Sequence, residues 1–383
     1  MEKTKVAIIR CNDYNEENVY KALLKGIDLI GGIDLFVKRG EKILLKVNNL
    51  AGSSPDECVT THPSILDAMF RILDKKGVKI SYGDSPGFEK SINALKKSGF
   101  FEIGEKYKIK PGDFDSGKSV DFEKGVVCKK FNIANACLDS DGLISLSKMK
   151  THQITGITGA VKNQFGCIYG INKASYHLKL SNPTKFSEML IELNLFLKPR
   201  LYIMDAISAM EGNGPRGGTP VKMNCLIISS DPVAIDATFA RMIDLNPLYV
   251  PTIKIGKSRG LGTYLEDEIE LLGDPIESFI NKDFNIVRKP VKNSSILSIT
   301  PKFIKNMVRN RPQIDPAKCI KCGICVDTCP VNEKAINFKN NDKSKPPVYN
   351  YNKCIRCYCC QEMCPKKAIS ISNPPLRRLL KRN

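Results

Sequence analysis

The sequence predicts an α/β domain built around a largely parallel sheet, followed by a small cysteine-rich α+β domain. Three observations lead to this prediction. Short apolar runs alternate with helical patterns through residues 1–295, a basic passage containing prolines follows at residues 296–313, and regularly spaced cysteines fill residues 314–372. A short basic tail at residues 373–383 completes the expected organisation.

The first half of the α/β domain alternates apolar runs of strand length with amphipathic patterns. Strands are expected at residues 5–9, 43–47 and 78–82. Helices are expected at residues 17–29 and from Pro63 to Gly77. Proline suits the first turn of a helix and glycine its end, and the apolar positions between them recur at helical spacing.

The second half continues this alternation less regularly. Strands are expected at residues 143–146, 201–204 and 225–228, and helical segments at residues 158–168, 183–197 and 232–242. Asn182 and Asp231 each precede a proline and are expected to cap the helices that follow. Residues 105–135 and 275–295 stay open between loop, hairpin and short helix.

Polar side chains follow several of these strands, and ligands of open α/β sheets bind beyond the carboxyl ends of the strands. The candidates for ligand binding are Lys46, Asn48, Ser85, Lys148, Lys162, Asn163, Glu211 and Asn213. The candidates for catalysis are Asp84, Lys150 and His152. Lysines beside helix N-termini suit a carboxylate or phosphate, and a histidine there can transfer protons.

Structural roles remain the alternative for these residues. Asp84 is also typical of a turn, and His62 of a helix cap. The glycine-rich residues 211–218 suit either an anion-binding loop or a mobile turn, because they match neither a P-loop nor G-x-G-x-x-G. The acids expected to be caps or structural groups, with divalent-cation binding as the alternative, are Asp205, Asp231 and Asp236.

Eight of the 15 cysteines form two runs of the pattern C-x2-C-x2-C-x3-C-P. This spacing is typical of [4Fe–4S] ligands in two-cluster ferredoxins, where the fourth cysteine of each run binds the other cluster. We therefore expect two clusters and a ferredoxin-like fold. The first cluster is expected on Cys319, Cys322, Cys325 and Cys364, and the second on Cys354, Cys357, Cys360 and Cys329. Zinc sites usually show separated C-x2-C pairs instead.

The remaining cysteines show no ligand spacing. Cys359, beside Cys360, would break the pattern and is expected not to bind a cluster. Cys167 lies near Lys162 and Asn163 and is open between a buried thiol and a reactive one. The others are expected to be buried thiols.

The net charge of +19 is concentrated in residues 301–383. A basic surface can steer an acidic electron-transfer partner, whereas nucleic-acid binding is disfavoured because no recognised motif is present. In the linker, four residues can form one apolar helical face: Phe303, Ile304, Met307 and Val308. No signal peptide or membrane span is recognisable, so we expect a cytoplasmic protein.

Several short runs of the front domain together resemble a known family. They are residues 60–63 (TTHP), 83–87 (GDSPG), 148–152 (KMKTH), 158–163 (TGAVKN) with 165–167 (FGC), and 210–215 (MEGNGP). In this order they resemble the family catalogued as domain of unknown function 362, over roughly residues 40–245. The resemblance implies an α/β domain coupled to clusters of the bacterial ferredoxin type, and it assigns no reaction.

These observations lead to the hypothesis of an iron–sulfur oxidoreductase. Electrons would pass through two clusters to or from an unidentified anionic small molecule or cofactor, with a low-potential donor or acceptor protein as partner. No motif identifies an organic cofactor. The alternatives are a non-enzymatic ferredoxin-like subunit that docks a partner enzyme, and structural clusters in a nucleic-acid-binding protein.

Overall fold

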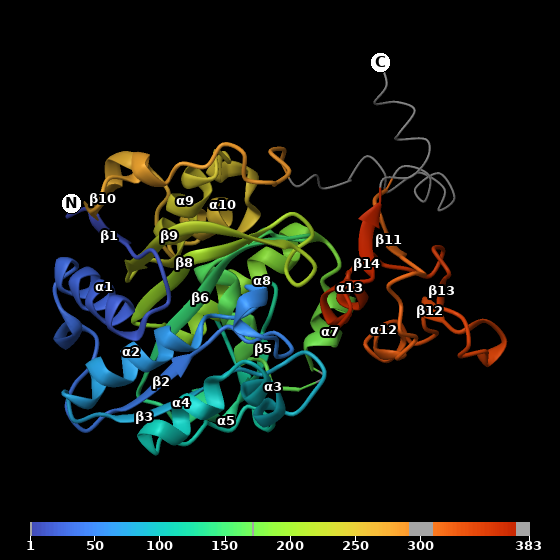
Figure 1. Ribbon diagram of the computed structural model, residues 1–383, viewed down its shortest axis with the longest axis horizontal. Helices are drawn as coiled ribbons and strands as arrows, with labels where there is room; N and C mark the ends of the chain where they lie inside the picture. The colour runs from blue at the N-terminus through green and yellow to red at the C-terminus, as the bar shows by residue number, and fades with distance from the viewer. Residues whose placement is uncertain (1, 171, 291–308, 373–383) are drawn as a thin grey trace.

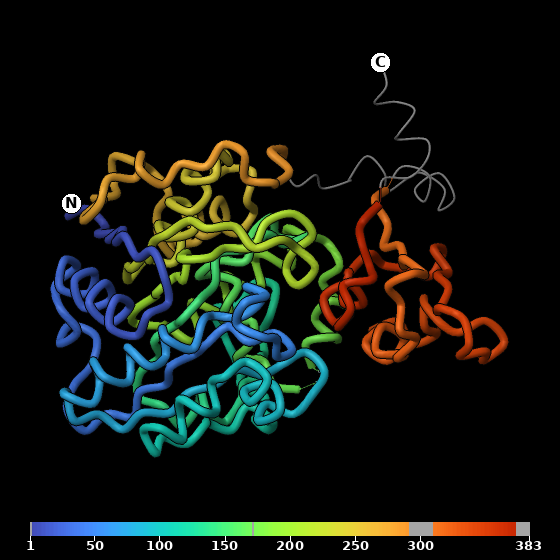
Figure 2. The backbone as a smooth tube through the Cα atoms, in the orientation of Figure 1, coloured from blue at the N-terminus to red at the C-terminus, as the bar shows by residue number. Residues whose placement is uncertain are grey.

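The computed structural model describes residues 2–170, 172–290 and 309–372. Over these residues the chain forms a large α/β front domain and a small module beside it (Figure 1), and Figure 2 traces the backbone of both. The expected helical face in the linker, with Phe303, Ile304, Met307 and Val308, and the basic tail lie outside the described residues. No helix within the described ranges is both long and apolar enough to cross a membrane.

One large sheet organises the front domain. Within the described residues it has eight strands in the order β10-β1-β9-β8-β6-β2-β3, with β7 paired to β6. The strands are β1 (Thr4–Arg10), β2 (Lys42–Lys46), β3 (Lys79–Gly83), β6 (Gly142–His152), β7 (Gly156–Thr158), β8 (Leu201–Glu211), β9 (Thr219–Ser229) and β10 (Ile269–Gly273). Only β9 and β7 run antiparallel to their neighbours. The predicted largely parallel sheet is confirmed.

Helices cover both faces of this sheet. They are α1 (Glu16–Leu29), α2 (Pro63–Asp74), α3 (Ser91–Lys97), α4 (Phe100–Tyr107), α5 (Asn135–Leu138), α6 (Ala160–Asn163), α7 (Asn172–Lys179), α8 (Pro183–Leu197), α9 (Pro232–Met242) and α10 (Pro251–Ser258). The hairpin of β4 (Gly117–Asp121) and β5 (Lys130–Ala134) lies outside the main sheet. The Asn182 and Asp231 side chains accept hydrogen bonds from the first backbone N–H groups of α8 and α9, as expected of N-caps.

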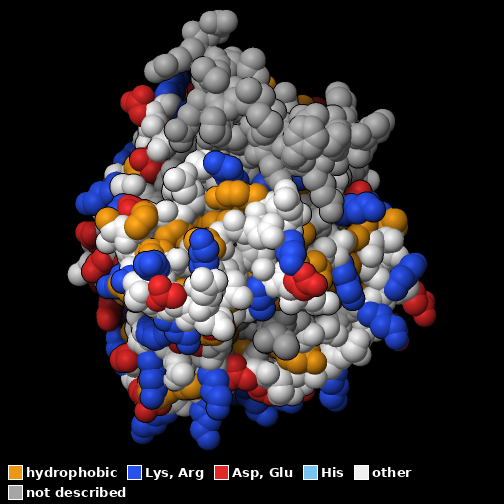
Figure 3. All heavy atoms as spheres, turned by 90° about the vertical axis from the view of Figure 1, so that its right-hand side faces the viewer, with side chains coloured by type: hydrophobic (Ala, Val, Ile, Leu, Met, Phe, Trp, Pro, Cys, Tyr) orange, Lys and Arg blue, Asp and Glu red, His pale blue; other side chains and the backbone are white. Residues whose placement is uncertain are grey.

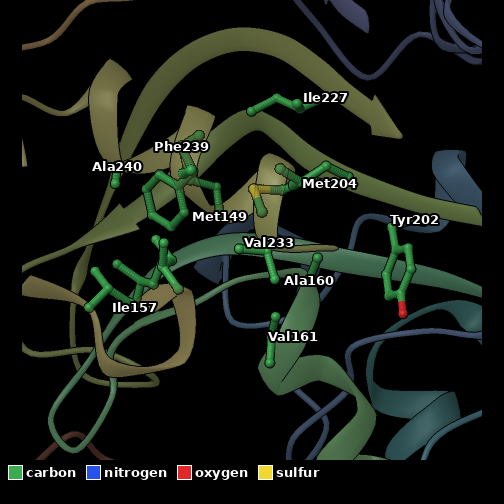
Figure 4. Close-up of a cluster of buried hydrophobic side chains, with 14 of the residues drawn as sticks. Met149, Ile157, Ala160, Val161, Tyr202, Met204, Ile227, Val233, Phe239 and Ala240 are labelled. Atoms are coloured by element: carbon green, nitrogen blue, oxygen red, sulfur yellow. The ribbon is translucent and has the colours of Figure 1, made fainter. Parts of the chain in front are cut away.

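Alternate strand residues supply two separate cores, because successive side chains of a strand point to opposite faces. Ile203 packs in the core beneath α1 and α2, whereas its neighbour Met204 packs in the core beneath α8 and α9. Figure 4 shows the second core, where Met204 and Ile227 of the sheet lie near Val233 and Phe239 of α9. The sheet is therefore packed against an apolar core on each face.

Three strands are much longer than the sequence predicts. β6 and β8 were expected to end near residues 146 and 204, and β9 to begin near residue 225, yet each has 11 residues. Apolar residues give way to Lys148, Lys150 and His152 in β6, and that change suggested the end of the strand. These polar side chains are buried, so the strand continues where the apolar pattern stops.

The segment at residues 158–168 is also not one helix. It contains the end of β7, the short helix α6 and a 3-10 turn at Gln164–Cys167. The carboxylate of Asp236 accepts hydrogen bonds from the backbone N–H groups of Ala160 and Val161, at 2.6 and 3.2 Å, and so starts α6 at Ala160. A cap supplied by a distant helix leaves no local sequence signal.

The cysteine-rich module is a small α+β unit, as predicted. It contains the helices α12 (Ile324–Asp327) and α13 (Cys359–Met363) and two antiparallel strand pairs. The pairs are β11 (Arg311–Ile314) with β14 (Ile369–Ser372), and β12 (Ile336–Asn337) with β13 (Val348–Tyr349). Each helix follows the first cysteines of one run, so the internal repeat in sequence is also a repeat in structure.

Candidate functional site

A cavity of about 340 Å³ lies between the front domain and the module. Its size is within the range of small-molecule sites. Six of the candidate residues line it: Asn48, Asp84, Ser85, Lys150, Lys162 and Asn163. The module contributes Asp327, Thr328, Cys329, Pro330, Lys334, Cys359, Glu362 and Met363. The module thus covers the crevice beyond the carboxyl ends of β2 and β3.

A buried ion pair lies at one wall of the cavity, and only its Asp84 member lines the cavity. Lys46 Nζ lies 2.8 Å from Asp84 Oδ1, and both side chains are almost completely buried. Lys46 also donates to the carbonyl oxygens of Val47 and Asn163, at 2.8 and 3.1 Å. A Cβ atom on Gly166 would overlap the Asp84 carboxylate, so only glycine lets this loop approach so closely. Lys46 therefore supports the cavity from behind and does not line it.

Lys150 has no carboxylate partner within ion-pair distance among the described residues. Its Nζ donates to Asn48 Oδ1 at 2.7 Å and to the Val59 carbonyl oxygen at 2.6 Å. Asn48 in turn donates to Asn163 Oδ1 at 3.1 Å. Burial lowers the pKa of Lys150 well below its ordinary value, because the charged form loses its hydration.

Lys162 and Lys173 bring further ammonium groups to the cavity. Lys173 Nζ donates to Ser85 Oγ at 2.6 Å, and burial lowers its pKa to about 7. The ammonium group of Lys162 makes no hydrogen bond or ion pair with the described residues, and it lies 5.7 Å from the centre of the Phe165 ring. Burial lowers the pKa of Lys162 as well. Asp84, Asp327 and Glu362 also line the cavity, but no carboxylate of the described residues lies within ion-pair distance of Lys150, Lys162 or Lys173. The cavity therefore suits an anionic ligand.

Sequence reasoning missed Lys173 and His177, both on α7. They are four residues apart and therefore share one helical face, which was the available signal. His177 is stacked on Phe186 with ring centres 4.7 Å apart, and burial lowers the pKa of His177 to about 4. At neutral pH this histidine is uncharged.

His152 faces the module and is not among the residues that line the cavity. Its Nδ1 accepts hydrogen bonds from the backbone N–H groups of Ile154 and Thr155, at 3.1 and 3.3 Å. The proton of the neutral ring must then be on Nε2, which lies 3.0 Å from Glu362 Oε1 on α13. Burial lowers the pKa of His152 to about 4. This geometry is that of a residue that positions the module.

Three other candidates also lie away from the cavity lining. Lys148 is buried against Asp205, with Nζ 2.8 Å from Oδ2. Glu211 accepts a hydrogen bond from the Asn285 backbone N–H at 2.7 Å. Asn213 contacts the module, because its Nδ2 donates to the Ile369 carbonyl oxygen at 3.1 Å.

The two expected ligand sets line two separate small cavities inside the module. One cavity contains Cys319, Cys322, Cys325 and Cys364 in its lining, and the other contains Cys329, Cys354, Cys357 and Cys360. Within the described ranges, no group of three or more His, Cys, Asp or Glu residues is close enough to hold a single metal ion.

Cys359 lies outside both cysteine cavities. It lines the large cavity between the domains and is absent from the lining of both cysteine cavities. The thiol of the neighbouring Cys360 accepts a hydrogen bond from the Tyr349 hydroxyl at 3.3 Å. Adjacent cysteines therefore face different cavities.

The fold and site define an α/β protein whose crevice is covered by an iron–sulfur module of ferredoxin type. The chain belongs to the family Domain of unknown function (DUF362), whose model matches residues 43–241, and a 4Fe-4S dicluster domain matches residues 318–368. The family resemblance is thereby confirmed. A thylakoid-associated protein of Synechocystis sp. (strain ATCC 27184 / PCC 6803 / Kazusa) is 30% identical over 257 residues, which cover 67% of this chain and 79% of that protein.

Two solved structures show weak similarity. The lactate racemase apoprotein from Thermoanaerobacterium thermosaccharolyticum has 15% identity and a TM-score of 0.39, and the match covers 58% of this chain and 54% of that one. A protein from Thermotoga maritima has 12% identity and a TM-score of 0.33, with 58% and 57% covered. The chain thus spans little more than half the length of either, and such low scores support no conclusion on function.

The buried Lys46–Asp84 pair generates a stability prediction. Asp84→Asn leaves the Lys46 ammonium buried beside a neutral amide and should lower the free energy of unfolding by about 3–5 kcal/mol. The matched control is Asp121→Asn, whose partner Lys130 is 3.2 Å away with both side chains mostly exposed. That change should cost at most about 1 kcal/mol. Anaerobic urea unfolding measures both, and equal losses would contradict the assignment of a buried pair.

Proposed function

We propose that the protein is an oxidoreductase in which two [4Fe–4S] clusters exchange electrons with an anionic small molecule held between the domains. The 4Fe-4S dicluster domain supports iron–sulfur electron transfer. One observation carries the finer proposal. The cavity is lined both by Cys329, an expected ligand of the second cluster, and by the crevice lysines, so a ligand there lies next to a redox centre.

The cluster assignment rests on the two cysteine cavities. Cys319, Cys322, Cys325 and Cys364 would hold the first cluster, and Cys329, Cys354, Cys357 and Cys360 the second. Bound clusters supply one-electron storage and transfer. Eight reduced thiolates also favour a reducing compartment such as the cytoplasm.

The anion would be a carboxylate or phosphate held by Lys150, Lys162 and Lys173. Ser85 and Asn48 fix two of these ammonium groups by hydrogen bonds. The ligand is expected to combine a charged group with an apolar part, because the lining also includes apolar side chains. These are Leu50, Phe165, Ala174, Pro215 and Met363. No motif identifies an organic cofactor.

The two cysteine sets differ in exposure, and this difference suggests where a protein partner docks. Cys322 of the first set is exposed, and Ile320 beside it is 55% exposed. Lys321 and Lys366 are exposed around the same cavity. Figure 3 shows Lys and Arg side chains spread over this side of the molecule. An acidic, low-potential electron carrier fits such a surface.

The alternative is an electron-transfer subunit without a substrate of its own. It is favoured by an open groove of about 650 Å³ beside Cys354, lined in part by Leu178 and Ile355. A partner enzyme that docks there would contact the second cluster set directly.

Neighbouring cysteines provide a matched test of the cluster assignment. Cys360→Ser should lose about half of the iron and sulfide, because one cluster loses a thiolate ligand. Cys359→Ser should keep both clusters, since its thiol faces the other cavity. Iron and sulfide analysis after anaerobic purification measures both variants. Equal iron loss from the two would show that the ligand set is wrongly assigned.

Anion binding should depend on pH through Lys173. Its pKa is about 7 because burial disfavours the charged form, while Asp84 opposes this effect and Lys46 adds to it. The ammonium loses its proton as pH rises through 7, so an anion should bind about tenfold more weakly at pH 8.5 than at pH 6. Sulfate is a suitable probe, because its charge is constant over this range.

Lys173→Arg is the control for this pH dependence, because a guanidinium stays charged throughout. Isothermal titration calorimetry with sulfate at low ionic strength should give a flatter pH profile for this variant. Identical profiles for the variant and the native protein would remove Lys173 from the binding site.

The reaction itself is tested by reoxidation of the reduced protein. After anaerobic reduction, a panel of carboxylates and phosphate esters should include an oxidant, and Lys162→Gln should slow that reaction at least about tenfold through loss of charge. Lys185→Gln, an exposed change on α8, serves as the control. If no panel member reoxidises the protein and none copurifies, the oxidoreductase proposal fails, whereas a stable complex in anaerobic pull-downs would support the subunit alternative.

A further inference from the structure

Arg216 is a buried cation that has no part in the anion binding proposed above. It lies in the loop between β8 and β9 and is only 9% exposed. Its Nη1 donates to the Met363 carbonyl oxygen of the module at 3.2 Å, and its Nε has no hydrogen-bond partner among the described residues. Two acids are close enough to influence Arg216, but each is paired with a lysine instead: Glu57 with Lys367 at 3.0 Å, and Glu89 with Lys97.

A buried guanidinium without a counter-ion is costly, because the charge loses its hydration. Burial lowers the pKa of Arg216, and the Cys364 thiol is one of the groups that oppose this effect. Met363, the residue that accepts the hydrogen bond, directly precedes Cys364. The missing negative charge is therefore expected at Cys364, where a thiolate-bound cluster would supply it.

The internal repeat of the module shows why this cation comes from the front domain. Arg356 lies between Cys354 and Cys357 in the second run, is buried, and donates from Nη1 to the Cys354 carbonyl oxygen at 3.0 Å. Lys321 occupies the equivalent position in the first run, but it is exposed. The second set thus has a buried cation from its own run, and the first set receives one from Arg216.

We propose that Arg216 is the buried counter-ion of the first cluster and raises its reduction potential. This inference rests on the cluster assignment in the proposed function. A nearby positive charge stabilises the more negative, reduced form of a cluster, and hydrogen bonds to sulfur act in the same direction. Arg216 is a positioning and tuning residue, and its neighbour Pro215 lines the anion cavity. The same loop therefore contacts both the anion cavity and the first cluster.

The test is a redox titration followed by electron paramagnetic resonance, with Cys360→Ser used to assign the signal of the first cluster. Arg216→Gln should shift the first potential to a more negative value and leave the second unchanged. Arg216→Lys keeps the charge and should restore most of the native potential. Lys367→Gln removes one half-buried charge at the same domain contact and should cause a smaller shift, because Glu57 and solvent already screen it.

Three results would overturn the inference: an unchanged first potential in Arg216→Gln with full iron content, an equal shift of both clusters, or equal shifts in Arg216→Gln and Lys367→Gln. If Arg216→Gln fails to assemble clusters, the native protein labelled with ¹⁵N-arginine provides the test. Pulsed electron paramagnetic resonance should then show coupling between an arginine nitrogen and the reduced first cluster, and the absence of this coupling would contradict the proposal. Iron analysis of the native protein separates this failure from failure of the cluster assignment.

Discussion

Buried lysines in the carboxyl-terminal parts of β2 and β6 impose the main physical constraint on this protein. Lys46 and Lys148 each lie 2.8 Å from one carboxylate oxygen, of Asp84 and Asp205, and all four side chains are nearly inaccessible to solvent. A buried charge requires such a partner, because the free-energy cost of removing the charge from water otherwise exceeds the stabilisation gained by packing. These pairs fix the strand ends. Lys150, also buried, has only an amide and a carbonyl oxygen as partners, and its side chain lines the cavity.

The module covers this cavity through polar contacts rather than through a continuous apolar interface. Gln361 Nε2 donates to the Asn213 carbonyl oxygen at 2.8 Å, and His152 Nε2 faces Glu362 at 3.0 Å. Both contacts involve α13, which lies between ligands of the two proposed clusters. Interfaces of this polar kind suit domains that dock in a defined orientation and can still adjust. The orientation matters here because it decides which cysteines face the cavity.

The sequence predicted the parts of this arrangement that are local in the chain. Cysteine spacing separates the two ligand sets because ligation depends on short loops, and proline after Asn182 or Asp231 marks a helix start. It did not predict the length of β6, because Lys148 and Lys150 look like solvent-exposed residues until their distant partners are known. It also missed Lys173, whose position depends on how α7 packs. Charges that are neutralised by residues far away in the chain leave no local pattern.

The two cysteine runs of the module repeat each other in sequence, but equivalent residues in them differ in their surroundings. Cys322 and Cys357 occupy equivalent positions, yet the first is exposed and the second is buried. Cys359 is equivalent to Ile324, so a thiol replaces an apolar side chain only in the second run, at a position that lines the cavity. Two halves of one fold would be expected to have similar surroundings if the module acted alone. Of these positions Cys359 lies where the front domain covers the module. The differences support the proposal that the two cluster sites would serve different neighbours, one in solvent and one in the cavity.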